Sequence, residues 1–395
     1  MMQRLLLAWQ YISYYRWRSL ILIGCITLTA FLPALLSILL TEFNERMLTR
    51  AQRTPLVLGA QGSGVDLTLH ALYFSKAPKN ELTYGEITKI RESGLGEAFP
   101  IYGRFTARDF PVVGTNLDYL EFRNAYLETG RTFAMLGECI LGSDVAKQLS
   151  LGAGDKLLTD RENLVDIAGL YPLRLNIVGV MKPTGTADDR AVFVDIKTAW
   201  VIAGLGHGHE DLTQVHDDGK IASRDEQHIE ARASVLPFIE INESNSGLVH
   251  FHGHPDEFPI TAAIIRCPDS KSETLLLGRF ESSTSGPQML IPSQIIGDLL
   301  GLVFQVSQIF NASMALIGLS TLLLLGLVIS LSLRLARREM NTMFRMGSSR
   351  GTIFQLQLFE LAIVCAISAV LLVALIALTY TYAGTVLEQL VLKRN

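Results

Sequence analysis

The segment RLARREMNTMFRMGSSRGTIFQLQLFE, residues 334–360, separates two long apolar stretches, and this arrangement decides the fold class. Residues 299–333 before it and 361–387 after it contain no charged side chain. Each stretch exceeds the roughly 20 apolar residues with which an α-helix crosses a bilayer. The segment between them carries five arginines and only two glutamates, so we expect it on the cytoplasmic side. We therefore predict an α-helical membrane protein.

The same segment has the pattern of two helices joined by a turn. Gly347 can adopt the left-handed conformation that ends a helix. Ser348 or Ser349 can then cap the next helix. Such a helical hairpin on the cytoplasmic side suits the binding of another protein.

The composition points to a large extramembrane domain. The chain has 395 residues, of which 49% are hydrophobic and only 18% are charged, against roughly 25% charged in a soluble domain. The apolar residues concentrate near 20–41, 299–333 and 361–387, whereas 42–298 has a soluble composition. A net charge of −4 and the lack of a basic patch argue against nucleic acid as a partner.

The order of these segments sets the expected topology. Aromatic residues and arginines alternate near the N-terminus, which is typical of a helix lying in the membrane interface on the cytoplasmic side. The domain between the first two crossings then lies outside the cytoplasm, which is the periplasm if the cell is Gram-negative, and we expect the protein in a bacterial inner membrane. The predicted segments are an interfacial helix (1–19), a first crossing (20–41), a periplasmic α+β domain (42–298) with a His-rich insert (205–256), a stalk and second crossing (299–333), a cytoplasmic coupling loop (334–360), a third crossing (361–387) and a tail (388–395).

Short apolar runs bounded by turn residues predict the elements of the periplasmic domain. The expected strands are Leu56–Gly59, Pro111–Gly114, Cys139–Gly142, Leu175–Met181, Ala191–Asp195 and Pro259–Cys267, and the expected helices are Tyr84–Ser93 and Ser143–Leu149. Cys139 and Cys267 both lie in this domain, and the sequence leaves open whether they pair.

Three stretches resemble the permease subunits of MacB/FtsX-type ABC transporters. ECILGSDVAKQLSLGAGDKLL (138–158) is similar to the family's strand–helix–Gly-Asp segment. LNIVGVMKPTGTADDRAVFVD (175–195) is similar to its Pro-Thr-Gly turn and Asp-bearing loop. The segment 334–360 resembles its cytoplasmic coupling loop. The resemblance implies a MacB-like periplasmic domain, and it covers nearly the whole chain. The family usually has four membrane helices and this chain has three clear ones, so we expect either that the chain is naturally shortened or that its final helix is missing here.

The resemblance also implies partners. Such permeases pair with a second copy or a paralogue, and an ABC ATPase dimer beneath them binds ATP and magnesium. This chain has no G-x-x-x-x-G-K-[ST] phosphate loop, so we expect no enzyme activity of its own. The residues expected to couple to the ATPase are Arg337, Arg338, Glu339, Arg345, Gly347 and Arg350. The simpler alternative is that these arginines only fix the membrane orientation.

Histidines concentrate in the insert of the periplasmic domain. The candidate metal ligands are His207, His209, His216, His228, His250, His252 and His254. Alternate residues of an extended chain share a face, so H-F-H-G-H at 250–254 aligns three imidazoles. Imidazoles among carboxylates suit zinc, or less selectively copper and nickel, bound transiently rather than as a permanent cofactor. The plainer interpretation is a polar, disordered insert, and the two are compatible.

Three functions therefore compete. The first is a permease that handles zinc, another divalent metal or its carrier protein, as in the zinc-acquisition branch of the family. The second is the same machinery serving a lipoprotein, peptide or toxin. The third is a non-transporting signal relay that activates a periplasmic partner. In each case we expect mechanotransmission from the ATPase to the outer domain, and a periplasmic or lipoprotein partner.

Overall fold

The structure, a computed structural model, describes residues 9–10, 12–161, 172–208, 221–224, 229–231, 239–242, 245–281, 286–335, 345 and 350–392. The chain forms two compact units, which we treat separately. The helical unit comprises Met1–Met47 and Leu299–Asn395, and the αβ domain comprises Leu48–Asp298.

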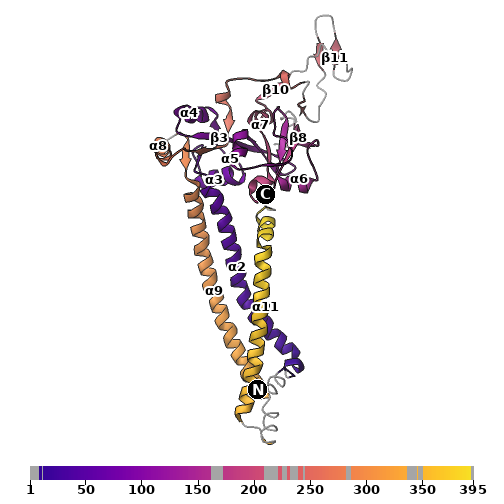
Figure 1. The fold of residues 1–395 in the computed structure, drawn as a ribbon, viewed down its shortest axis with the longest axis vertical. Coiled ribbons are helices and arrows are strands. Elements are labelled where there is room, and N and C mark those ends of the chain that lie inside the picture. Colours follow the sequence, from indigo (N-terminus) through magenta and orange to yellow (C-terminus); the bar gives the residue numbers. More distant parts are fainter. Residues whose placement is uncertain are drawn as a thin grey trace. The chain divides into compact units, whose positions relative to one another are not determined.

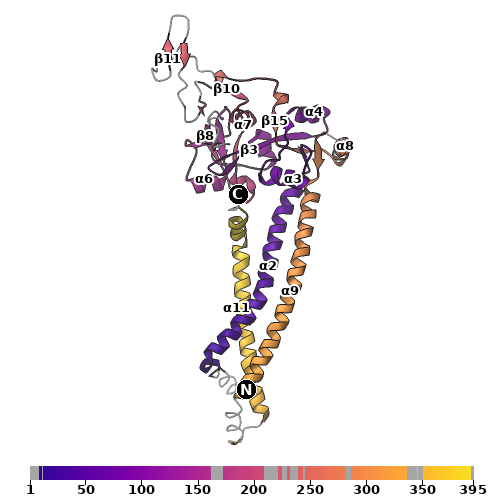
Figure 2. The same ribbon diagram turned by 180° about the vertical axis from the view of Figure 1, so that it is seen from behind.

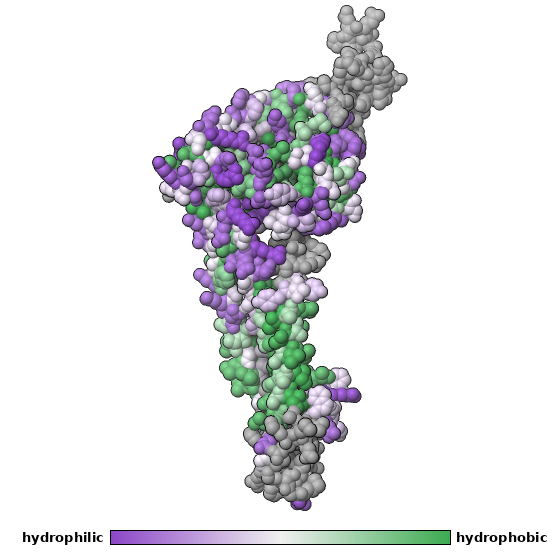
Figure 3. All heavy atoms as spheres, viewed as in Figure 1, coloured by the Kyte–Doolittle hydropathy of each residue, from purple (hydrophilic) through white to green (hydrophobic). Residues whose placement is uncertain are grey.

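Three long helices dominate the helical unit: α2 (Arg16–Gln52), α9 (Pro292–Leu335) and α11 (Arg350–Leu392). Each contains a span long and apolar enough to cross a membrane. Within this unit the helices run alongside one another in both views (Figures 1 and 2). On the face shown in Figure 3, apolar residues gather along part of these helices, as expected for side chains that face lipid. The three charge-poor runs of the sequence are thus helical, and α2 continues beyond the predicted crossing at 20–41.

Helix α2 contacts both of the other long helices. The hydroxyls of Thr29 in α2 and Thr321 in α9 lie 3.5 Å apart. Arg18 in α2 forms an ion pair with Glu360 in α11. A charge near a membrane is stabilised when a partner neutralises it, so this pair accounts for the glutamate at the start of the third apolar run.

The described residues of the αβ domain build one mixed sheet of eleven strands. Its main path is β13–β8–β6–β9–β4–β3–β16–β1–β17, with β5 and β7 also paired to β8. The strands are β1 (Leu56–Gly59), β3 (Glu97–Ala107), β4 (Phe110–Thr115), β5 (Leu127–Gly130), β6 (Glu138–Leu141), β7 (Lys156–Leu158), β8 (Leu173–Met181), β9 (Val192–Asp195), β13 (Ile239–Glu240), β16 (Ala262–Arg266) and β17 (Gln288–Leu290).

Smaller elements surround this sheet. The two-stranded pairs are β2 (Leu82–Thr83) with β15 (Pro259–Ile260), β10 (Gly206–Gly208) with β14 (Val249–Phe251), and β11 (Ile221–Arg224) with β12 (Ile229–Ala231). The helices are α3 (Gly64–Tyr73), α4 (Gly85–Ser93), α5 (Leu117–Phe122), α6 (Ser143–Leu149), α7 (Ile196–Ile202) and α8 (Ser270–Glu281), with short 3₁₀ turns η1 (Ala187–Arg190), η2 (Ser246–Leu248) and η3 (Pro255–Glu257).

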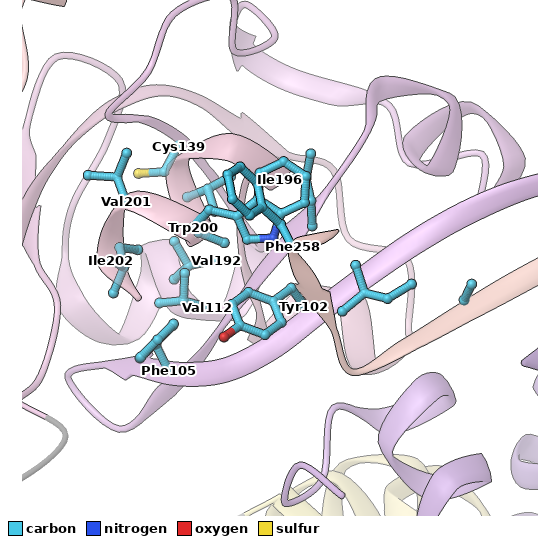
Figure 4. Packing of buried hydrophobic residues seen from close by; sticks show 14 of the residues in the cluster. Tyr102, Phe105, Val112, Cys139, Val192, Ile196, Trp200, Val201, Ile202 and Phe258 are labelled. Atoms are coloured by element: carbon cyan, nitrogen blue, oxygen red, sulfur yellow. The ribbon is translucent and has the colours of Figure 1, made fainter. Parts of the chain in front are cut away.

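Helices cover both faces of the sheet. On one face the Trp200 indole of α7 packs edge-on against Phe258 (Figure 4) and also against Tyr84. On the other, the Phe193 ring of β9 contacts Phe74, which follows α3, and Tyr119 of α5. Strands buried on both faces are apolar at successive positions rather than at alternate ones. Residues 56–58 of β1, 139–141 of β6 and 192–194 of β9 are buried and apolar at every position, as this rule predicts.

The predicted α+β domain is confirmed, and all eight predicted elements are present to within a few residues. The predicted strand Pro259–Cys267 is divided at Thr261 into β15 and β16. The four cysteines are free, which answers the open question of a Cys139–Cys267 pair. Cys139 is buried in the core, where burial raises the pKa of its thiol and keeps it unreactive.

Candidate functional site

Within the αβ domain, a buried ion pair joins Arg50, near the C-terminal end of α2, to Asp188. The Arg50 guanidinium donates two hydrogen bonds of 2.9 Å to the two carboxylate oxygens of Asp188 in η1. Its Nε also donates to the backbone carbonyl of Leu72 in α3. The side chains of Arg50 and Asp188 are only 7% and 3% exposed. A two-pronged, water-excluded contact of this kind holds its partners in one geometry.

Two hydroxyls complete the environment of this carboxylate. Tyr119 of α5 donates to Asp188 Oδ1 at 3.0 Å, and Thr186 donates to Oδ2 at 3.0 Å. Burial by itself raises the pKa of Asp188, but the Arg50 charge and the hydrogen bonds outweigh it and lower the pKa to about 2. Burial raises the pKa of Tyr119 to about 12, so the phenol stays protonated and can donate. The carboxylate is therefore charged at any physiological pH.

The loop that presents Asp188 is itself preorganised. The Asp189 carboxylate accepts hydrogen bonds from the backbone N–H groups of Thr184 (2.8 Å) and Gly185 (2.7 Å). Gly185 has a φ of +66°, a conformation that glycine adopts without a steric penalty. Gly142 packs against the loop so closely that an added Cβ would lie 2.4 Å from the Asp189 carbonyl. The Pro-Thr-Gly turn noted in the sequence therefore positions Asp188.

A second arginine joins α5 to the end of α2. The Arg123 Nη1 donates to Thr54 Oγ1 at 3.0 Å, just beyond the last residue of α2. Its guanidinium lies 5.6 Å from the Tyr119 ring and 5.0 Å from the Phe122 ring. The guanidinium therefore has cation–π contacts with both rings in addition to its hydrogen bond to Thr54. Burial, and then repulsion by Arg50, lower the pKa of Arg123.

We name these residues the stalk junction. Its members are Arg50, Thr54, Tyr119, Arg123, Thr186 and Asp188. Within it the Arg50 guanidinium pairs with the buried Asp188 carboxylate, and the Arg123 guanidinium bonds Thr54 and lies against the Tyr119 ring. These contacts hold the C-terminal end of α2, η1 and α5 together.

The structure describes part of the histidine insert. In the β10–β14 pair His207 lies directly opposite His250 in the strand register. The rings of His250 and His252 are 4.8 Å apart, centre to centre. His254 Nδ1 accepts a hydrogen bond of 3.3 Å from the backbone N–H of Asp256, which uses one of its two nitrogens. His209, His216 and His228 lie outside the described residues. Within the described ranges no three metal-binding side chains form a ready ligand group.

The predicted coupling residues lie at the edges of what the structure describes. Arg345 is helical and exposed, and Arg350 begins α11. Arg337, Arg338, Glu339 and Gly347 lie outside the described residues. Their role therefore stays a prediction.

Comparison with known proteins supports the family resemblance. The family model described as the MacB-like periplasmic core domain matches residues 25–231. The chain belongs to this family. The match begins within α2 and includes every member of the stalk junction, so this MacB-like protein carries the junction inside its family core.

Two solved structures are also similar to this MacB-like chain. The periplasmic region of MacB from Actinobacillus actinomycetemcomitans is 10% identical, with a TM-score of 0.36, covering 63% of this chain and 93% of that one. The extracellular domain of the noncanonic ABC-type transporter YknZ from Gram-positive bacteria is 11% identical, with a TM-score of 0.32, covering 60% and 98%. The comparison with curated proteins gave no match.

Proposed function

We propose that this MacB-like protein is the membrane subunit of an ABC transporter and converts ATP hydrolysis by a separate subunit into movement of its periplasmic domain. The observation that supports the proposal is the family match, which starts in one apolar helix and continues to residue 231, within the domain that lies between apolar helices in the sequence. The chain itself performs no catalysis on this proposal. A dimer of ATPase subunits beneath the membrane supplies the energy, and a second permease copy or a paralogue completes the assembly.

Movement would pass from the coupling loop 334–360 into the long helices and along α2 to the stalk junction. An α-helix is stiff along its axis because its backbone hydrogen bonds run in that direction. The end of α2 is tied to η1 through Arg50 and Asp188 and to α5 through Thr54 and Arg123. Displacement of α2 would therefore move η1 and α5 first. The orientation that this requires, with the N-terminus in the cytoplasm, follows from the arginines of the loop.

The proposal predicts an ATPase partner. The test is affinity purification of the tagged full chain from native membranes, followed by identification of every chain that travels with it. We expect a nucleotide hydrolase with a phosphate-binding loop in wild type. We expect this hydrolase no longer to co-purify when Arg337, Arg338, Arg345 and Arg350 are all replaced by serine. As a matched control, replacement of the exposed Arg53 and Arg161 of the αβ domain by serine should leave the hydrolase bound. Absence of any nucleotide hydrolase would refute the proposal.

A divalent metal, or a protein that carries one, is the cargo that we propose. The supporting observation is the pairing of two histidine-bearing strands, with His207 opposite His250 and the His250 and His252 rings adjacent. Neutral imidazole is a common ligand of zinc. The test is a zinc titration of the purified full chain with a competing fluorescent indicator. H250A/H252A should lose saturable binding, whereas H70Q should keep it because His70 is buried and hydrogen-bonded elsewhere. Equal binding by all three proteins would leave a lipoprotein, peptide or toxin, or a signalling role, as the function.

A further inference from the structure

A large cavity opens on the αβ domain beside α5, away from the histidine strands. Its volume is about 1220 Å³, and its walls come from the end of α4, the start of β3, α5, and the residues at and after the end of β16. Small-molecule pockets measure roughly 300–1,000 Å³. A cavity of this size suits a segment of a larger ligand rather than a compact metabolite.

An aromatic pair forms one wall of the cavity. The rings of Phe99 and Phe122 stack with centroids 4.8 Å apart and planes at 20°. The Arg266 guanidinium lies 5.6 Å from the first ring and 5.8 Å from the second. Glu97 accepts hydrogen bonds from Arg266, so the charge of this arginine is already compensated. Phe99 is buried, and the stacked wall is therefore a fixed part of the domain rather than a loose surface side chain.

The remaining charges leave the cavity acidic. Its walls carry Arg91 and Arg266 against Glu97, Asp118 and Glu121, a net charge of −1. Arg91 donates a 2.8 Å hydrogen bond to the carbonyl of Ala98, which holds it against the wall. The side chains of Asp118 and Glu121 are exposed, and neither forms an ion pair with any residue that the structure describes. Asp118 Oδ2 accepts a 2.8 Å hydrogen bond from the neutral Asn116 amide, which leaves the negative charge of both carboxylates to attract a positively charged ligand.

An exposed aromatic ring completes the recognition surface. Tyr126 lines the same cavity and is 67% exposed. A lysine or arginine side chain gains a cation–π contact over such a ring and an ion pair with a nearby carboxylate. Aromatic rings interleaved with carboxylates thus favour a basic segment over an acidic one.

We infer that this cavity binds a basic, extended peptide segment of a partner or cargo protein, held by Asp118 and Glu121 against the aromatic wall. The inference rests on the proposed function only for the source of the peptide, since binding can be measured without an ATPase. Two carboxylates three positions apart on a helix lie on one side of it, so a single segment can contact both.

The cavity shares a helix with the stalk junction. Helix α5 supplies Asp118, Glu121 and Phe122 to the cavity, while its Tyr119 donates to Asp188. The Phe122 ring also contacts Arg123, which bonds Thr54 at the end of α2. A peptide bound in the cavity would therefore contact α5, the same six-residue helix that contributes Tyr119 to the stalk junction. This places ligand recognition next to the point at which movement of α2 would arrive.

The test measures peptide binding to the full chain in neutral detergent micelles. The probe is a fluorescein-labelled ten-residue peptide of lysine, arginine and glycine with one tyrosine, and its twin has glutamate at each basic position. Anisotropy should show saturable binding of the basic peptide alone. D118N/E121Q should weaken it about tenfold, from two lost surface charge pairs. The control E45Q/E257Q removes two exposed carboxylates outside the cavity and should bind like wild type.

A charge reversal keeps the test independent of folding. D118K/E121K should prefer the acidic twin, a gain of binding that a misfolded protein would not show. The inference is overturned if D118N/E121Q binds like wild type, if both peptides bind wild type alike, or if neither saturates. Peptide binding without a co-purified ATPase would refute the proposed function and leave the site standing. An ATPase partner without peptide binding would overturn the inference about this cavity and leave the proposed function standing.

Discussion

Removal of Arg50 should destabilise the αβ domain far more than removal of an arginine one turn earlier on the same helix. R50M leaves the Asp188 carboxylate buried without its cation, and the loss of one partner from a buried pair costs about 3–5 kcal/mol. In a domain of about 250 residues each kcal/mol shifts Tm by about 2–4 °C, so we expect a fall of about 6–20 °C. Arg46, whose side chain is 40% exposed and pairs with Glu42, is the control. R46M should shift Tm by about 2 °C or less, since exposed helical pairs contribute about 0.5 kcal/mol.

The assay can report on the αβ domain alone. The chain has three tryptophans, and Trp200 is buried in the core of this domain with its indole N–H donated to the Pro259 carbonyl. In a W9F/W17F background its fluorescence follows thermal unfolding of the domain. The double variant R50M/D188N should be less destabilised than the sum of R50M and D188N, because the two residues are coupled. Equal shifts for R50M and R46M, or additive effects of the two single substitutions, would refute the importance of the pair.

Three further outcomes follow from the structure. Burial lowers the pKa of His70 in the folded protein, so as pH falls below about 6.5 the imidazole is protonated in the unfolded chain before it is protonated in the folded one. The Tm of the domain should therefore fall between pH 7 and 5, and H70Q should reduce this fall. Thermal melts followed by Trp200 fluorescence at each pH would check this. Hydrogen bonds from Arg131 lower the pKa of Glu138, so this carboxylate stabilises the folded domain above about pH 4.5 and loses that effect as the pH falls further. E138Q should therefore make the stability of the domain less sensitive to acid below about pH 4.5. An acid unfolding transition identical to that of wild type would contradict this. In G142A the new Cβ meets the Asp189 backbone, which should cost about 1–3 kcal/mol; a urea titration that gives a wild-type midpoint would count against the close packing.

The membrane helices and much of the sheet could be predicted because their signals are local. Charge-free runs identify lipid-facing helices without reference to the rest of the chain. The limits of β1 and α6 were predicted to the residue, because apolar runs there end at Gly and Ser positions. The longest strand, β3, was missed. Pro100 lies within it and a bulge falls between Tyr102 and Phe105, so neither alternation nor an unbroken apolar run marks it.

The stalk junction could not be predicted from the sequence because its contacts are long-range. Arg50 and Asp188 are separated by 138 positions, and nothing in their local sequences indicates a pair. The loop around Asp188 was recognised through its Pro-Thr-Gly turn, but its buried partner was not. Likewise the strand register that sets His207 opposite His250 depends on the fold of the insert, whereas the alternation of His250 and His252 is local and was predicted.

Nucleotide-dependent hydrogen exchange tests the central claim most directly, namely that ATP hydrolysis inside the cell moves the periplasmic domain through α2. The purified complex with its ATPase would be placed in lipid nanodiscs and compared with and without ATP and vanadate. We predict that exchange changes in residues 184–190 and in α5, and that the change is lost in R50M/D188N while hydrolysis continues. Unchanged exchange in both segments during active hydrolysis would contradict the account.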